Sequence, residues 1–160
     1  RAPGVPGAVL TTGWVTAGLI ADGLHVAPAL LEMAARLKGA SGLTLTSDAV
    51  AAAGSPPGRY RLGTQVVVSD GRRIVLEDGV TLAGSMATLD VLVRTMAQLP
   101  GAGLPAAIAM ATSTPARLLG ESGWGTLRVG AAADLVVLDG DLQVQATLVA
   151  GEIAYRRRLA

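Results

Sequence analysis

Two short apolar runs in this chain each end in ionisable residues, and these residues are its strongest candidates for chemistry. Residues 44–47 lead directly to Asp48, and the alanines and glycine of residues 49–54 leave open space beside its carboxylate. Residues 18–21 lead to Asp22, and His25, which follows closely, is the only histidine in the chain. A carboxylate at the end of a strand is a typical acid or base of barrel enzymes, so we interpret Asp48 as a catalytic acid/base.

Each candidate also has a structural interpretation. Asp48 could cap the loop that follows it, His25 could be a satisfied core or loop residue, and Asp22 could only shape the turn before Gly23. Arg1 could be a solvated loop residue. Chemistry is favoured because two neighbouring strands would both end in polar residues, so that both would face the same edge of a sheet.

The segment 82–85 is a third candidate. It precedes the most regular helical pattern of the chain, and backbone amides at a helix start bind anions or hydroxyls. The alternative is a simple helix cap at Ser85.

Composition excludes several classes of function. A net charge of +1, without a basic stripe that includes aromatic residues, argues against nucleic acid as a partner, and no apolar run is long enough to cross a membrane. The chain has no cysteine, which fits a reducing compartment, and we expect a cytoplasmic protein. One histidine cannot form a catalytic zinc site of about three protein ligands, and the motifs of serine hydrolases and of nucleotide-binding loops are missing.

The first third of the chain has the pattern of a βαβ unit. Residues 17–24 form a continuous apolar run, which is typical of a buried parallel strand. Pro28 suits the first turn of a helix that ends at Gly39, and residues 43–46 form the next strand. We therefore predict two parallel strands with a helix between them, preceded by a loop over residues 1–13.

The remainder is predicted to contain one hairpin, three helices and a small sheet. Residues 65–68 and 73–76 flank a turn at Asp70-Gly71. Apolar residues at helical spacing follow from Leu89, a second helix covers residues 104–111, and a short third one stops at Gly120. Residues 133–139, 145–149 and 152–155 are then predicted to form a separate antiparallel sheet.

Six segments, taken in order, resemble the N-acetylglucosamine-6-phosphate deacetylase family of the amidohydrolase superfamily, and they match only the C-terminal portion of that enzyme. They are Arg1-x-Pro-Gly and residues 18–25, 37–39, 47–54, 82–85 and 130–135. The resemblance implies an α/β fold that is the C-terminal part of a (β/α)8 TIM-type barrel plus strands of a small β-sandwich. Residues 1–122 would supply the last two barrel strands and the following helices, with a hairpin insertion near 60–79, and residues 123–160 would belong to the sandwich.

The resemblance also implies an activity, which is the hydrolysis of the N-acetyl group of N-acetylglucosamine-6-phosphate. Asp48 matches the aspartate that takes a proton from the attacking water and returns it to the leaving amine. The substrate would be bound by eight further residues, with His25 and Arg1 at its phosphate and Arg1 reaching across a homodimer. These residues are Arg1, Asp22, Gly23, Leu24, His25, Leu82, Ala83 and Gly84.

The implied cofactor is a divalent metal ion, with zinc as the first expectation and iron or another metal as the alternative. Its ligands in the family are a glutamate and two histidines on earlier strands, outside these 160 residues, and Asp48 would touch a second ion if two bind. We therefore expect the isolated chain to be inactive. Two alternatives stay open: a non-catalytic truncated or complementing fragment, and an amidohydrolase acting on another cyclic amide or aminated base.

Overall fold

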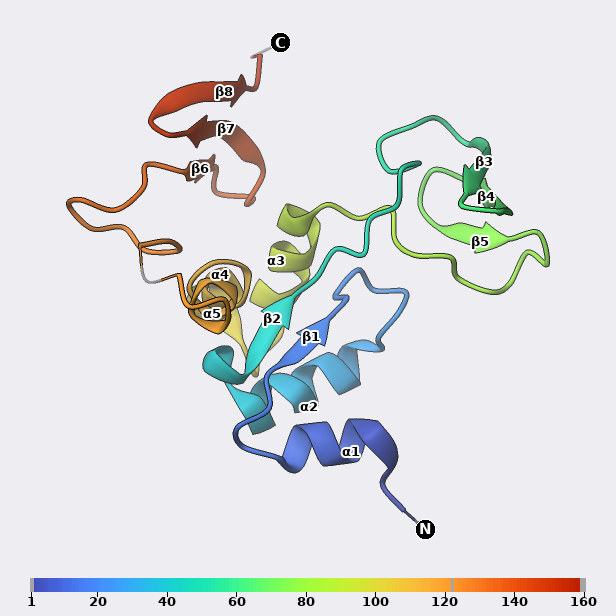
Figure 1. Cartoon of the computed structure of the whole chain (residues 1–160), viewed down its shortest axis with the longest axis horizontal. Coiled ribbons are helices and arrows are strands. Elements are labelled where there is room, and N and C mark those ends of the chain that lie inside the picture. The colour runs from blue at the N-terminus through green and yellow to red at the C-terminus, as the bar shows by residue number, and fades with distance from the viewer. Residues whose placement is uncertain (1, 122, 159–160) are drawn as a thin grey trace.

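The computed structural model describes residues 2–121 and 123–158, which form a mixed α/β chain with three separate sheets (Figure 1). Helical and extended segments alternate in the first part, and strands dominate the last part. The helices are α1 (Gly4–Thr11), α2 (Pro28–Lys38), the 3-10 helix η1 (Ala40–Gly42), α3 (Leu89–Ala97), α4 (Gly103–Ala111) and α5 (Ser113–Leu118). The strands are β1 (Ala17–Leu19), β2 (Leu43–Leu45), β3 (Gly58–Leu62), β4 (Gln65–Ser69), β5 (Ile74–Leu76), β6 (Leu135–Leu138), β7 (Val144–Val149) and β8 (Glu152–Arg156).

The predicted βαβ unit is confirmed. Strands β1 and β2 are parallel, with Ala17 opposite Leu43 and Leu19 opposite Leu45, and α2 connects them. Helix α2 starts at Pro28, whose missing N–H is not needed in a first turn, and it ends at Gly39, which has a φ of 61°. The carboxyl ends of β1 and β2 therefore lie side by side, which is the arrangement that the candidate residues need.

Strand β1 is shorter than the run of residues 17–24 predicted. Its ladder stops at Leu19 because β2 stops at Leu45, and the last bond joins the Thr46 N–H to the Leu19 carbonyl. Beyond it, Asp22 accepts hydrogen bonds from the backbone of residues 24 and 25, which turns the chain. The apolar run thus predicts the first residue of β1 correctly and its last residue incorrectly.

The prediction of a loop over residues 1–13 is wrong, because residues 4–11 form α1. Pro3 is its N-cap and Pro6 lies in its first turn, where backbone N–H groups have no partner within the helix. Both prolines therefore fit the helix start instead of breaking it. None of the residues of α1 is buried, and the helix packs on α2.

The main hydrophobic core lies between the parallel strands and helices α2, α3 and α4. Its largest fully buried side chains come from α2, β2, α3 and α4: Leu31, Leu43, Leu92, Met96 and Met110. As predicted, α3 directs its helical apolar positions inward, while Asp90 and Arg94 pair across one turn at 2.8 Å.

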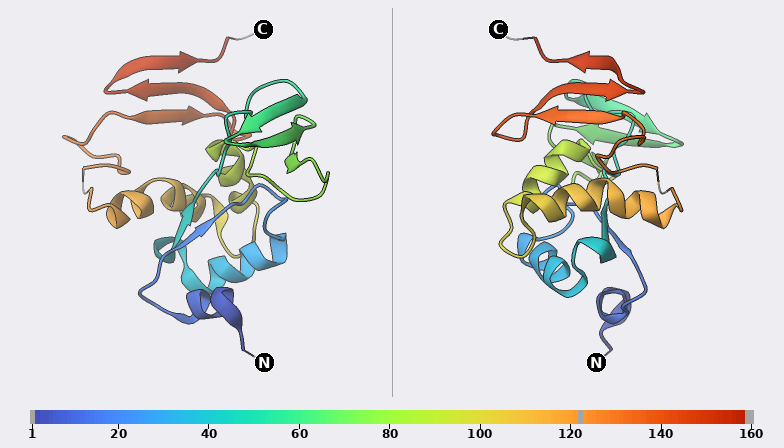
Figure 2. Two further views of the ribbon diagram at one scale, coloured as in Figure 1. Left: turned by 45° about the vertical axis from the view of Figure 1, so that its right-hand side comes forward. Right: turned by 90° about the vertical axis from the view of Figure 1, so that its left-hand side faces the viewer.

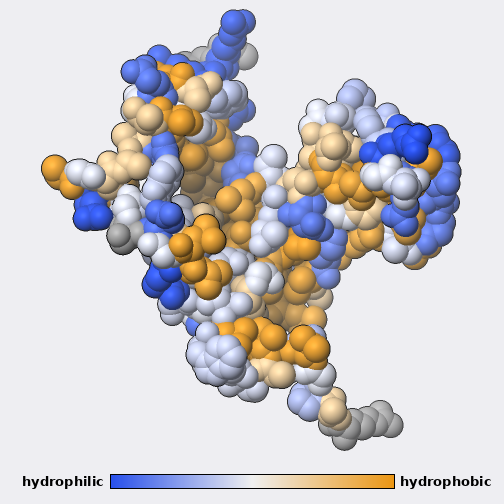
Figure 3. Space-filling view, viewed as in Figure 1, coloured by the Kyte–Doolittle hydropathy of each residue, from blue (hydrophilic) through white to orange (hydrophobic). Residues whose placement is uncertain are grey.

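Two antiparallel sheets lie at the end of the molecule away from the N-terminus (Figure 2). The predicted hairpin is confirmed as β4 and β5, and β3 adds a third strand, with Val67 and Ile74 in a small separate core. The predicted C-terminal sheet is confirmed with the order β6-β7-β8. The space-filling view shows the molecule hollowed between these two sheets (Figure 3). None of the helices formed by the described residues is long and apolar enough to cross a membrane.

The α2 core contact gives a direct test of the fold. Leu31 is fully buried and its neighbour Leu30 is 52% exposed. Leu31→Ala should lower the free energy of unfolding by about 2–5 kcal/mol, because it removes apolar contacts and leaves a cavity. Leu30→Ala should change it by less than about 0.5 kcal/mol. Urea unfolding of the two variants measures both, and equal losses would contradict the burial of α2.

Candidate functional site

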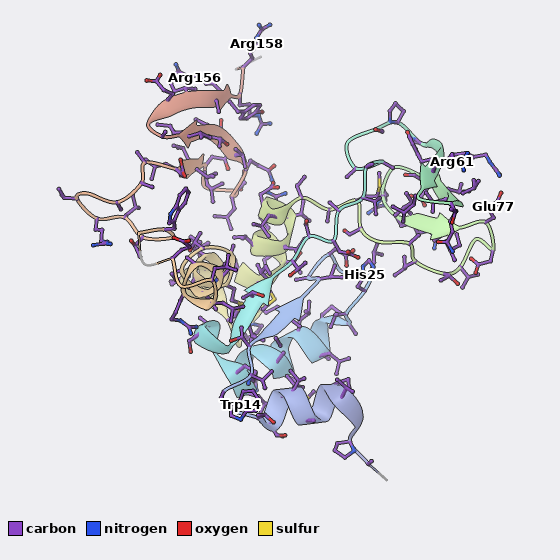
Figure 4. The ribbon with its side chains drawn as sticks, in the orientation of Figure 1. Trp14, His25, Arg61, Glu77, Arg156 and Arg158 are labelled. Atoms are coloured by element: carbon purple, nitrogen blue, oxygen red, sulfur yellow. The ribbon has the colours of Figure 1, made fainter. Side chains whose placement is uncertain are left out.

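Asp22 organises the turn at the end of β1. Its Oδ1 accepts hydrogen bonds from the backbone N–H groups of Leu24 at 2.9 Å and His25 at 3.0 Å. Its Oδ2 lies 2.8 Å from Nδ1 of His25. A carboxylate only accepts hydrogen bonds, so the imidazole donates from Nδ1 and its Nε2 remains available for a ligand. Figure 4 shows His25 on the segment that follows β1.

The Asp22 carboxylate is nearly enclosed, with only 3% of its side chain exposed, against 17% for His25. Burial alone would raise the pKa of Asp22. The backbone N–H groups of His25 and Leu24, with the His25 ring, outweigh that effect and hold the pKa below its ordinary value. Asp22 is therefore a fixed negative charge beside the histidine.

Ser85 links its own segment and the segment that carries Asp48 to this turn. Its hydroxyl lies 3.3 Å from Oδ2 of Asp22, and its backbone N–H donates to the carbonyl of Asp48 at 2.8 Å. The predicted helix start or helix cap at this position is wrong, because α3 begins at Leu89 after Thr88. The sequence pattern indicates the serine but not its hydrogen-bond partner Asp22, which lies 63 positions earlier in the chain.

Asp48 lies just beyond β2 with an exposed side chain. Its backbone has a φ of 50°, a left-handed conformation that aspartate tolerates better than most residues. The next residue, Ala49, forms a parallel bridge with Ser85. The hydrogen bond from Ser85 thus fixes the backbone carbonyl of Asp48, while the carboxylate of Asp48 is exposed.

The 82–84 segment packs between Asp48 and strand β5. Leu82 pairs with Val75, and the N–H of Ala83 donates to the carbonyl of Ile74. Gly84 has a φ of 92°, and a Cβ there would lie 2.5 Å from Cγ1 of Val50 and 3.1 Å from the carbonyl oxygen of Asp48. Only glycine permits this close approach.

The other predicted site residues lie as follows. Gly23 and Leu24 are exposed in the Asp22 turn. Arg1 lies outside the described residues. Among the residues that the structure describes, no three histidine, cysteine, aspartate or glutamate side chains are grouped so that they could hold a metal ion. Two open depressions of about 310 and 320 Å³ lie elsewhere, beside Trp124 and beside β4 and β5.

A family model described as the amidohydrolase family matches residues 13–154. The N-acetylglucosamine-6-phosphate deacetylase of Danio rerio is 45% identical over 88% of this chain, and that of Homo sapiens is 43% identical over 98%. The chain spans only 35% and 39% of the length of these two relatives. A putative N-acetylgalactosamine-6-phosphate deacetylase of Escherichia coli is 40% identical, and the match covers 96% of this chain and 92% of that protein.

Solved structures give the same likeness. The N-acetylglucosamine-6-phosphate deacetylase of Thermotoga maritima superposes with a TM-score of 0.89 at 33% identity, over 96% of this chain and 42% of that one. A mutant of the Mycobacterium smegmatis deacetylase in complex with N-acetyl-D-glucosamine-6-phosphate superposes with a TM-score of 0.85 at 38% identity, over 91% and 39%.

The lowered pKa of Asp22 predicts acid sensitivity. Above the ordinary carboxyl pKa of 3.8, both the folded and the unfolded chain carry Asp22 ionised, and its contribution to stability is complete. As the pH falls below that value, the unfolded chain takes up the proton first, so the free energy of unfolding declines until the folded pKa is passed.

Asp22→Asn removes the contribution of Asp22 to the pH dependence of the free energy of unfolding and leaves every other carboxylate in place. Urea unfolding of both proteins from pH 6 down to pH 3 should therefore show a smaller acid loss in the variant. Parallel pH profiles of the two proteins would contradict a lowered pKa of Asp22 in the folded chain.

The close approach at Gly84 predicts a second effect. Gly84→Ala should lower the free energy of unfolding by about 1–3 kcal/mol and shift the amide resonances of Asp48 and Ser85, because strain from positive φ adds to the clash with Val50. Gly79→Ala is the matched control, since Gly79 also has positive φ (74°) but open space around it. Equal losses in the two variants would show that the packing against Asp48 is unimportant.

Proposed function

Since the chain belongs to the amidohydrolase family, we propose that it forms part of an enzyme that hydrolyses the N-acetyl group of N-acetylglucosamine-6-phosphate to glucosamine-6-phosphate and acetate. The observation that carries this proposal is the exposed Asp48 carboxylate on a loop that Ser85 links to the Asp22–His25 pair, in a chain whose relatives bear the name of that deacetylase. The absence of cysteine supports the cytoplasm as its compartment.

The proposed fold of the whole enzyme is a (β/α)8 barrel in which β1 and β2 are the seventh and eighth strands. In support, β1 and β2 are parallel and joined through α2, and a parallel sheet is stable only as part of a larger, covered sheet. The remaining barrel strands would come from a stretch of chain equivalent to the part of the relatives that these 160 residues do not match. Strands β6 to β8 would then belong to the small sandwich, which suits their exposed apolar residues Val136, Val137 and Ile153.

Asp48 is the proposed catalytic residue. Water adds to the acetamide carbonyl, and the carboxylate of Asp48 accepts a proton from that water. The same proton then passes to the nitrogen as the C–N bond breaks, so that the amine departs and acetate remains. An exposed carboxylate on a backbone fixed by Ser85 is suited to both transfers.

Substrate recognition is assigned to the turn and loop around Asp48. His25 would donate from Nε2 to the phosphate, since Asp22 occupies its Nδ1. Gly23 and Leu24 would contact the sugar from the same turn, and residues 82–84 would close over it. Arg1 of a second copy would complete the phosphate site in a homodimer, because a guanidinium binds phosphate through two parallel hydrogen bonds.

The metal expected of this family fits these residues only in part. Amidohydrolases generally use a divalent metal, which polarises the carbonyl and activates water when it is bound. The described residues include no group of three potential ligands that could hold such an ion. We propose zinc or iron, held mainly by residues outside these 160 positions.

A second candidate is a non-catalytic or complementing fragment. It is favoured by the Escherichia coli relative, which has nearly the length of this chain and is named only as a putative deacetylase of the galactosamine compound. That name also makes N-acetylgalactosamine-6-phosphate the alternative substrate.

Complementation separates these candidates. The chain is co-expressed with the part of the Mycobacterium smegmatis deacetylase that it does not match, and acetate release is measured with both phosphorylated acetylhexosamines. We expect the chain alone to be inactive and the complemented protein to prefer the glucosamine compound. No activity in a soluble complex would favour the non-catalytic candidate.

Asp48→Asn tests the catalytic assignment in that complex. The variant should lose about 10²–10⁴-fold in kcat, because an amide cannot accept the proton, and should keep its metal content and KM. Asp141→Asn is the control, since Asp141 is an exposed aspartate in the turn between β6 and β7. Turnover near that of the unmutated complex would remove Asp48 from the mechanism.

A further inference from the structure

We propose that Ser85 is a positioning residue that fixes the Asp22–His25 pair relative to the loop that carries Asp48. Ser85 is 2% exposed, although it lies in a connecting segment between β5 and α3. The structural part of this inference stands on its own contacts, and its consequence for catalysis rests on the function proposed above.

The hydroxyl of Ser85 has one donor and two acceptor positions. It accepts a hydrogen bond from the N–H of Ala87 at 2.9 Å, and its other partner is Oδ2 of Asp22 at 3.3 Å. Since a backbone N–H only donates and an ionised carboxylate only accepts, the hydroxyl proton must point to Asp22. The serine is therefore oriented by both neighbours.

The main chain of Ser85 is bonded on the opposite side to the Asp48 loop. Its N–H donates to the carbonyl of Asp48 at 2.8 Å, and its carbonyl accepts from the N–H of Val50 at 3.2 Å. These two bonds form a parallel bridge centred on Ala49. One residue thus fixes the position of Asp48 through its backbone and contacts Asp22 through its side chain.

Asp22 depends on this contact because its other donors belong to its own turn. The N–H groups of Leu24 and His25 and the His25 ring would all move with Asp22 if the turn shifted. Among the hydrogen bonds made by the described residues, Ser85 supplies the one donor to Asp22 from another part of the chain. It also shares Oδ2 with His25, so it limits rotation of the carboxylate and, through it, of the imidazole.

The single histidine allows a direct test. In the neutral ring the bond to Asp22 places the proton on Nδ1, and ¹⁵N NMR of the histidine-labelled chain reads the ratio of the two tautomers without overlap. Ser85→Ala leaves the Asp22 carboxylate free to rotate away from the ring and should lower the Nδ1–H share, changing that ratio by about fivefold, the effect of losing the hydrogen bond between Asp22 and Nδ1.

Ser69→Ala is the matched control. Ser69 is also buried and its hydroxyl accepts from the N–H two residues on, at Gly71, as Ser85 does at Ala87, but it does not touch Asp22. We expect an unchanged ratio in this control. Ser85→Cys places a slightly larger side chain with a weaker donor at the same position and decides the matter if Ser85→Ala does not fold, with an intermediate ratio expected. A wild-type ratio in the folded Ser85 variants would overturn the proposal.

The catalytic consequence is measured separately in the complemented enzyme. Ser85→Ala should raise KM for the phosphorylated substrate about tenfold and have a smaller effect on the unphosphorylated one, because His25 is no longer held toward the phosphate. Equal effects on both substrates would overturn this part. If the complex has no activity with any variant, the proposed function fails, while the tautomer ratio still tests the position of Ser85.

Discussion

The carboxylate of Asp22 is the constraint on which this part of the molecule depends. A nearly enclosed negative charge must be matched by donors, and Asp22 obtains them from two backbone amides, an imidazole and a distant hydroxyl. Meeting that need turns the chain toward α2 after β1 has ended and sets the orientation of His25. It also draws Ser85, and with it the segment before α3, onto the ends of the two parallel strands.

The parallel pairing of β1 and β2 converts this local turn into a shared edge. Because their register places Leu19 opposite Leu45, Asp22 and Asp48 both follow the ladder within three residues of its end. The main hydrophobic core, which includes Leu31, Leu43 and Leu92, packs against the two strands and fixes their position. The loops that follow the strands are shaped by hydrogen bonds and by the small apolar cluster that Val50, Ala52 and Ala83 join.

Local patterns in the sequence predict most of the helices and strands, because the start and end signals of these elements depend on neighbours along the chain. Pro28 and Gly39 bounded α2, and Asp70-Gly71 marked the β4–β5 turn. The failures come from contacts between distant residues: the end of β1 was fixed by its partner strand, and α1 packs on α2. The same holds for the candidate site, where Asp22, His25 and Asp48 were named from spacing, but the role of Ser85 depends on a bond across 63 positions.

We propose that the polar groups carry only part of the chemistry of a larger enzyme. The described residues bring together a histidine oriented by a carboxylate, an exposed aspartate and a glycine loop, and they include no group of three potential metal ligands. Binding and proton transfer need groups fixed to within a fraction of an ångström, and Ser85 and Gly84 supply that by backbone contact. A metal site needs several ligands at one point, which neighbouring strands provide only when more of them are present. The two kinds of chemistry can therefore be carried by different stretches of chain, provided that the strand edges between them pair.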